Sequence, residues 1–231
     1  MSLPKLDVPT FELTLPSTSK KVLYRPFLVK EHKTLLILKD SEDSDSIRII
    51  SEIVDVCTFN KLKISELPSV DLEYLFLNIR AKSLGEIVEL IINCDCGNKI
   101  DYAMDITKLN IVKDKNHTTK ISITSDIGLE MRYPKFDDTM NIFITNDQSK
   151  IFDLIISCVK SIYTKEDYYE ITHDNKKELE EFIYSMTKEQ FEKVEEFFET
   201  MPKLKQEIDV VCSKCNTHNY TVLEGLQNFF V

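Results

Sequence analysis

The sequence predicts an α+β fold built from amphipathic helices and small β-hairpins, two of which carry cysteine turns. Three observations lead to this prediction. Only 4 Gly and 7 Pro occur among 231 residues, which favours long regular elements over a loop-built scaffold. Apolar residues recur at three- and four-residue steps in several segments, as on the buried face of a helix. Two further segments, ELIINCDCGNKIDYAMDI and EIDVVCSKCNTHNYTVL, each have the pattern of a strand, a cysteine turn and a second strand.

The first half of the chain divides into three predicted segments. Residues 1–30 form an N-terminal β-hairpin arm, because apolar and polar residues alternate on both sides of the Pro-Ser-Thr-Ser sequence at 16–19. Residues 31–92 form a first helical block with three apolar stripes. Residues 93–136 form a β section that holds the first cysteine hairpin and a second hairpin around Asp126-Ile127-Gly128.

The second half is predicted to be mainly helical before it ends in a hairpin. Residues 137–206 form a second helical block, in which Thr187 and Gln190 have the spacing of a capping box. Residues 207–231 form the C-terminal cysteine hairpin and an apolar tail, and we expect them to make one compact domain with residues 93–136. One amphipathic helical face in the second block is predicted to comprise Ile151, Leu154, Ile155, Cys158 and Ile162.

The paired cysteine turns are the sharpest chemical signal in the chain. Each turn supplies two sulfur atoms, so two facing hairpins would complete a tetrahedral site for a structural zinc ion. Cys-x-x-Cys on a strand turn is a strong half-site, whereas Cys-x-Cys is rarer and tighter. The alternatives are a degenerate zinc ribbon, a disulfide or unlinked thiols. The predicted zinc ligands are Cys94, Cys96, Cys212 and Cys215.

The other two cysteines, the net charge and the lengths of the apolar runs argue against a reactive thiol, nucleic-acid binding and a membrane span, respectively. Cys57 and Cys158 fall on apolar helical stripes, where a cysteine is usually inert. A formal net charge of −10 argues against sequence-independent binding of nucleic acid, which needs clustered lysine and arginine. The apolar runs are too short to span a membrane, and no signal-peptide pattern opens the chain, so we expect a protein of the cytoplasm in which it is made.

No catalytic arrangement of residues is recognisable. The sequence has no Gly-rich phosphate loop, no nucleophile elbow and no His-Glu-x-x-His pair. A thiol oxidoreductase would need its first cysteine at a helix N-terminus, whereas Cys212 follows a predicted strand. We therefore expect a protein that is not an enzyme.

Several phrases together resemble a known family. These are VLYRPFLVKEHKTLL, DLEYLFLNIRAKSLGEIVEL before the first cysteine pair, and KELEEFIYSMTKEQFEKVEEFFETMPKL before the second pair and GLQNFF. In this order, from Val22 to Val231, they resemble the baseplate hub assembly protein family of T-even-like contractile-tailed bacteriophages. The resemblance implies a non-enzymatic hub component or assembly factor that acts by contact with other baseplate hub or tape-measure proteins. It implies a location in the host cytoplasm during assembly, with the tail baseplate of the virion as a second location.

Four residues outside the cysteine turns are candidate partner-binding residues. Phe229 and Phe230 form an apolar pair of the kind that serves as a docking peptide. Arg25 and Arg80 lie at the edges of apolar surfaces, where arginine forms either a structural ion pair or a contact with a partner. The alternative functions are a zinc-ribbon nucleic-acid module and, with less support, a thiol oxidoreductase.

Overall fold

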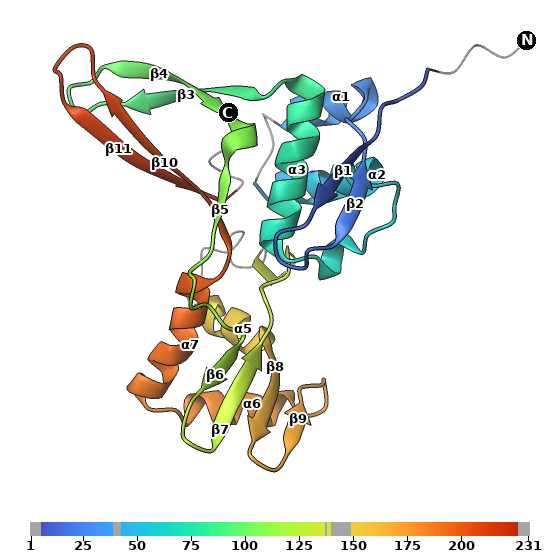
Figure 1. Ribbon diagram of the computed structural model, residues 1–231, viewed down its shortest axis with the longest axis vertical. Coiled ribbons are helices and arrows are strands. Elements are labelled where there is room, and N and C mark those ends of the chain that lie inside the picture. Colours follow the sequence, from blue (N-terminus) through green and yellow to red (C-terminus); the bar gives the residue numbers. More distant parts are fainter. Residues whose placement is uncertain (1–5, 39–42, 137, 140–148, 226–231) are drawn as a thin grey trace, which may run out of the picture. The chain divides into compact units, whose positions relative to one another are not determined.

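The computed structural model describes residues 6–38, 43–136, 138–139 and 149–225 (Figure 1). The chain folds into two compact units. Unit 1 comprises residues 1–112 and 203–231, and unit 2 comprises residues 113–202. Both units combine helices with antiparallel strands, which confirms the α+β class. Among the described residues, no helix has both the length and the apolar composition needed to cross a membrane.

The first part of unit 1 is a hairpin followed by helices. Strand β1 pairs antiparallel with β2, as the alternating sequence predicts, and Leu15, Val22 and Tyr24 are buried. Helix α3 is buried along much of its length, and it ends where Gly85, at φ +108°, donates its N–H to the carbonyl of Ala81. The elements are β1 (Phe11–Thr14), β2 (Lys21–Tyr24), α1 (Val29–Leu38), α2 (Asp43–Cys57), the 3-10 helix η1 (Ile64–Glu66) and α3 (Ser69–Leu84).

The second part of unit 1 consists of two β-hairpins from distant parts of the chain. One hairpin pairs β3 with β4, and the other pairs β10 with β11, while β5 adds a short third strand beside β10. The inner face of the first hairpin buries Val88, Leu90 and Ile92, and β10 buries Leu204 and Ile208. The elements are β3 (Ile87–Asn93), β4 (Lys99–Asp105), the 3-10 helix η2 (Ile106–Lys108), β5 (Asn110–Val112), β10 (Lys203–Val211) and β11 (His218–Glu224).

Unit 2 contains a four-stranded antiparallel sheet, in the order β6-β7-β8-β9, together with helices. Apolar residues of the strands and helices form its core, among them Leu129, Leu179 and Val194, together with Cys158 in the connection before β8. Helix α7 begins with the predicted capping box between Thr187 and Gln190. The elements are β6 (Lys120–Ser122), β7 (Ile127–Met131), α5 (Ser149–Ser157), β8 (Val159–Thr164), β9 (Tyr168–Glu170), α6 (Lys176–Tyr184) and α7 (Lys188–Thr200).

One predicted helical face in unit 2 is wrong beyond residue 157. Helix α5 ends at Ser157, and Val159–Thr164 and Tyr168–Glu170 are strands that extend the sheet. Cys158 and Ile162 are four residues apart, a spacing that fits a helical face and also the alternation of a strand. The segment VKSIYT is rich in β-branched and aromatic residues, which prefer a pleated sheet, and this preference is realised here.

Candidate metal centre

The two cysteine turns are built in closely similar ways. After β3, the Cys94 N–H donates to the Asn98 carbonyl at 2.9 Å and the Gly97 N–H donates to the Cys94 carbonyl at 2.8 Å. After β10, the Cys212 N–H donates to the Thr217 carbonyl at 2.9 Å and the Asn216 N–H donates to the Cys212 carbonyl at 2.8 Å. The second turn is therefore one residue longer, which matches its Cys-x-x-Cys spacing against Cys-x-Cys.

Each turn closes through a residue with a left-handed backbone. Gly97 has a φ of +79° and Asn216 has a φ of +56°. Glycine adopts this conformation without steric cost, and asparagine is among the residues that tolerate it best. The sequence after each cysteine pair therefore fixes the turn that directs the sulfur atoms.

The structure brings the four sulfur atoms of the two turns together. Cys94 Sγ lies 3.6 Å from Cys215 Sγ, and Cys96 Sγ lies 3.7 Å from Cys212 Sγ. All four sulfur atoms lie within 4.8 Å of one another. Zinc binds thiolates at about 2.3 Å, so a tetrahedral site places its sulfur atoms roughly 3.8 Å apart. The separation of the sulfur atoms thus fits a four-coordinate ion of this size.

Hydrogen-bond donors around the sulfur atoms favour thiolates in part of the cluster. The N–H groups of Cys215 and Lys214 hold the pKa of Cys212 down to about 6. The Asn98 side-chain amide also donates to Cys212 Sγ, at 3.5 Å. The hydroxyl and the N–H of Thr217 lower the pKa of Cys215. Metal binding requires deprotonated thiols, so these donors prepare the second turn as a ligand pair.

In the first cysteine turn, the surroundings of Cys96 favour the protonated thiol. The Asn98 N–H acts to lower the pKa of Cys96, but partial loss of solvent around the sulfur and the three neighbouring thiols together raise it to about 11. A bound cation reverses this balance, because it offsets the repulsion among neighbouring thiolates. Cys94 and Cys212 are buried and Cys96 and Cys215 are exposed, so an ion at this site would have a protected side and an open side.

The two remaining cysteines and the nearby His218 lie outside this cluster. Cys57 and Cys158 are fully buried, as predicted, and burial raises the pKa of Cys57 to about 11 and that of Cys158 to about 12. His218 lies on β11, where its Nδ1 is 3.1 Å from Asp209 Oδ1. In the part of the chain that the structure describes, the four clustered cysteines form the only group with metal-ligand geometry.

The structure places the candidate partner-binding residues in different environments. Arg25 is buried, and its Nη2 donates to Glu31 Oε1 at 2.9 Å. Arg80 lies half-buried on α3, and its buried Nη1 has no hydrogen-bond partner among the described residues. Burial lowers the pKa of Arg80. Phe229 and Phe230 lie outside the described residues, so their predicted role stays a prediction.

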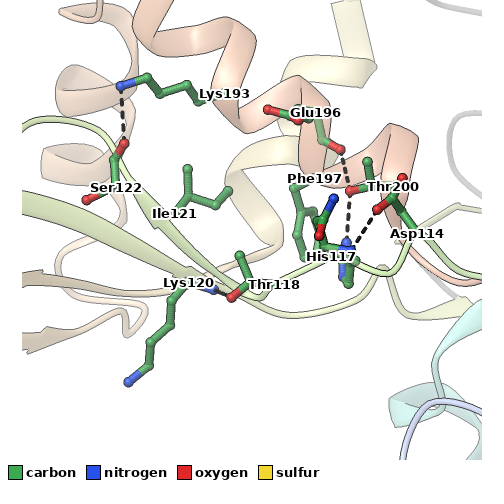
Figure 2. Close-up of a pocket in the computed structure, with 11 residues that line it drawn as sticks. Asp114, His117, Thr118, Lys120, Ile121, Ser122, Lys193, Glu196, Phe197 and Thr200 are labelled. Carbon is green, nitrogen blue, oxygen red and sulfur yellow. Dashed lines mark hydrogen bonds between the residues drawn. The ribbon is translucent and has the colours of Figure 1, made fainter.

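A polar pocket in unit 2 was not apparent from the sequence. Its volume is about 390 Å³, and it lies between the segment before β6 and helix α7 (Figure 2). His117 Nδ1 lies 2.9 Å from Thr200 Oγ1, and burial lowers the pKa of His117. The Lys193 ammonium also lines the pocket. It donates to the carbonyls of Ser122 and Ile123, so it is engaged by the protein itself. The pocket has no motif-like spacing because its walls come from residues about 80 positions apart, and we assign it no chemistry.

The fold and the sulfur cluster define a class of protein: a two-unit α+β protein whose candidate site is a cluster of four cysteines from two hairpin turns. Comparison with known families identifies the family of the chain. The family described as T4 bacteriophage base plate protein matches residues 8–231, and the chain belongs to this family. The chain is also similar to the baseplate hub assembly protein gp26 of Enterobacteria phage T4, with 26% identity over 215 residues, covering 92% of this chain and 93% of that protein. No solved structure matches the chain.

Proposed function

We propose that this protein is a non-enzymatic component or assembly factor of a phage baseplate hub, and that a structural zinc ion joins its two cysteine hairpins. The observation that carries the proposal is the meeting of Cys94 and Cys96 with Cys212 and Cys215 within 4.8 Å, although the two turns are more than a hundred residues apart in the sequence. The likeness to a protein named for hub assembly supports the hub part of the proposal.

The ligand set favours zinc over other common metals. Four thiolates in a tetrahedral arrangement suit zinc, whereas magnesium and calcium prefer oxygen ligands. Structural zinc sites are closed by four protein ligands, whereas catalytic sites keep one position for water or substrate. A site filled by Cys94, Cys96, Cys212 and Cys215 has no open position, which fits a structural role.

The metal would stabilise the β3–β4 hairpin of unit 1. The β3–β4 hairpin is a two-stranded sheet, and such a hairpin is at best marginally stable alone. Its cysteine turn lies at the end remote from η2, beyond the last strand pair Asn93↔Lys99. An ion shared with the turn after Val211↔His218 would hold the free ends of both hairpins in one place.

Metal content provides the first test. The chain, purified under reducing conditions, should contain about one zinc per molecule by elemental mass spectrometry. Cys96→Ser should lower this content, whereas Ser213→Ala, a change in the opposite turn that removes no sulfur, should keep it. Chelation should also reduce the β-sheet signal in circular dichroism. Freshly reduced protein without zinc would contradict the metal part and leave the hub part standing.

Co-expression provides the second test. The protein should co-purify with one or more of the other baseplate hub or tape-measure proteins when all are made together, and it should do so from the host cytoplasm. Contacts through protein surfaces should survive chelation unless they involve the cysteine hairpins. If the chain stays alone in the presence of the complete hub set, the hub part of the proposal is wrong, whatever its zinc content.

A further inference from the structure

The two cysteine turns have equivalent residues at the position that closes each turn. Asn98 and Thr217 both follow the residue with a left-handed backbone, and the carbonyl of each accepts the N–H of the first cysteine of its turn at 2.9 Å. The N–H of Asn98 also hydrogen-bonds Cys96, and the N–H of Thr217 hydrogen-bonds Cys215. The backbones of the two residues thus make equivalent contacts, and the difference between them lies in their side chains.

The side chains of these two residues contact different turns. The Thr217 hydroxyl lies 3.3 Å from Cys215 Sγ, within its own turn. The Asn98 side chain instead reaches the opposite hairpin, where its Nδ2 donates to Cys212 Sγ at 3.5 Å. This hydrogen bond connects residues 114 positions apart in the sequence. It therefore joins the two hairpins through a group that is not itself a metal ligand.

The buried position of Cys212 makes its sulfur dependent on donors from the protein. Cys212 is 0% exposed, whereas Cys215 is exposed. A thiolate that binds a metal keeps negative charge, and water cannot offset that charge at a buried sulfur. Two donors to Cys212 are the N–H groups of Lys214 and Cys215 in its own turn, and Asn98 adds a third from the opposite hairpin. At the exposed Cys215, water can replace the Thr217 hydroxyl.

We infer that Asn98 is a positioning residue of the metal site, whose side-chain amide holds Cys212 of the opposite turn and stabilises its thiolate beside the bound ion. The inference rests on the proposed zinc site and adds to it a residue outside the four ligands. Hydrogen bonds from such outer residues orient metal ligands, and their loss typically lowers metal affinity about 10–100-fold. The same amide would hold the two pairs of ligands near each other before the ion binds.

Competition for zinc between the full-length, reduced chain and a chelator of known affinity tests the inference. Asn98→Ala should weaken zinc binding roughly 10-fold, because two of the three donors to Cys212 remain. Asn98→Asp keeps the shape of the side chain but places a negative charge beside the sulfur, so it should weaken binding more. Thr217→Val is the matched control, and it should weaken binding less than about 3-fold because water can reach Cys215.

Cobalt substitution separates this role from a general loss of stability. Co²⁺ occupies tetrahedral thiolate sites as zinc does, and its complex has a sulfur-to-cobalt charge-transfer band. The energy of this band falls when a sulfur loses a hydrogen-bond donor, because the sulfur then holds its electrons less tightly. Asn98→Ala should shift the band to lower energy and keep the tetrahedral spectrum. Thr217→Val should leave the band close to its wild-type position.

The outcomes distinguish the role of Asn98 from the existence of the metal site. Wild-type zinc affinity in Asn98→Ala would overturn the role of Asn98 and leave the zinc site standing. Weaker binding with an unshifted charge-transfer band would also contradict the inference, because Cys212 would then not have lost a donor to its sulfur. A wild-type chain that takes up neither zinc nor cobalt would overturn both the proposed site and the role of Asn98.

Discussion

Removal of the Glu31 carboxylate should destabilise unit 1 by about 4 kcal/mol. Arg25 and Glu31 are 8% and 6% exposed, and the guanidinium and the carboxylate are 2.9 Å apart. The other carboxylate oxygen of Glu31 accepts the Leu28 N–H at 2.7 Å. Glu31→Ala therefore leaves a buried cation whose remaining acceptors, among the residues that the structure describes, are the Pro26 carbonyl and Cys57 Sγ. Breaking a buried pair on one side costs roughly 3–5 kcal/mol.

Urea unfolding followed by circular dichroism measures this loss, because the chain has no tryptophan for fluorescence. Glu12→Ala is the matched control, since Glu12 pairs with Lys21 at 2.6 Å on an exposed surface. An exposed pair contributes about 0–1 kcal/mol. An equal decrease in the free energy of unfolding for both variants would show that burial does not strengthen the contribution of the Arg25–Glu31 pair.

The pH dependence of the same pair has a definite sign. Burial acts to raise the pKa of Glu31, but hydrogen bonds from Arg25 and Leu28 outweigh it, and the pKa is lowered. A carboxylate with a lowered pKa in the folded state stabilises the fold above its unfolded pKa of about 4.3. That contribution is lost as the pH falls through the folded pKa. The stability difference between wild type and Glu31→Gln should therefore narrow in acid.

Two further predictions concern contacts that no sequence motif indicates. Gly128→Ala should cost about 1–2 kcal/mol in thermal unfolding, because a Cβ at Gly128 would lie 2.2 Å from Tyr163 Cζ and the ring would have to move; an additional Tyr163→Ala change should remove most of the further loss, and an unchanged melting temperature would contradict the clash. Asp71 accepts the N–H and the hydroxyl of Ser17, so Asp71→Ala should cost about 1–3 kcal/mol while Asp71→Asn should cost less. Burial raises the pKa of Asp71, so its contribution falls as the pH rises from its unfolded to its folded pKa, and Asp71→Asn should remove this dependence.

The sulfur cluster could be anticipated because cysteines in strand turns leave few arrangements open. Four thiols in two hairpin turns can bind one metal ion together only if the turns face each other. The structure places Cys94 beside Cys215 and Cys96 beside Cys212. The hydrogen-bond donors to these sulfur atoms could not be anticipated in the same way. They depend on backbone directions at Lys214 and Thr217, which the residue types do not specify.

The helices and hairpins were predictable where one pattern dominates and ambiguous where two patterns coincide. The capping box at Thr187 and the β1–β2 hairpin follow from local spacing. The sequence pattern predicts a helix at strand β8, because the apolar residues there fit both periods. Contacts such as His117 with Thr200 join residues 83 positions apart, and local spacing carries no information about them. The sequence predicts an ion pair or a partner contact for Arg25, and the structure identifies Glu31 as its counter-ion.

The position of the cysteines within the hairpins gives a reason why a metal ion would suit this site better than additional apolar contacts. The outer faces of the strands are largely exposed, and Ile87 and Ile91 on β3 face outward, so each hairpin buries only one face. A turn at the far end of such a hairpin has little core to pack against. The proposed metal ion would need no core, because its bonds to Cys94, Cys96, Cys212 and Cys215 would act directly between the two turns. The proposed ion would stabilise the turn ends of both hairpins without requiring the outer faces of their strands to be buried.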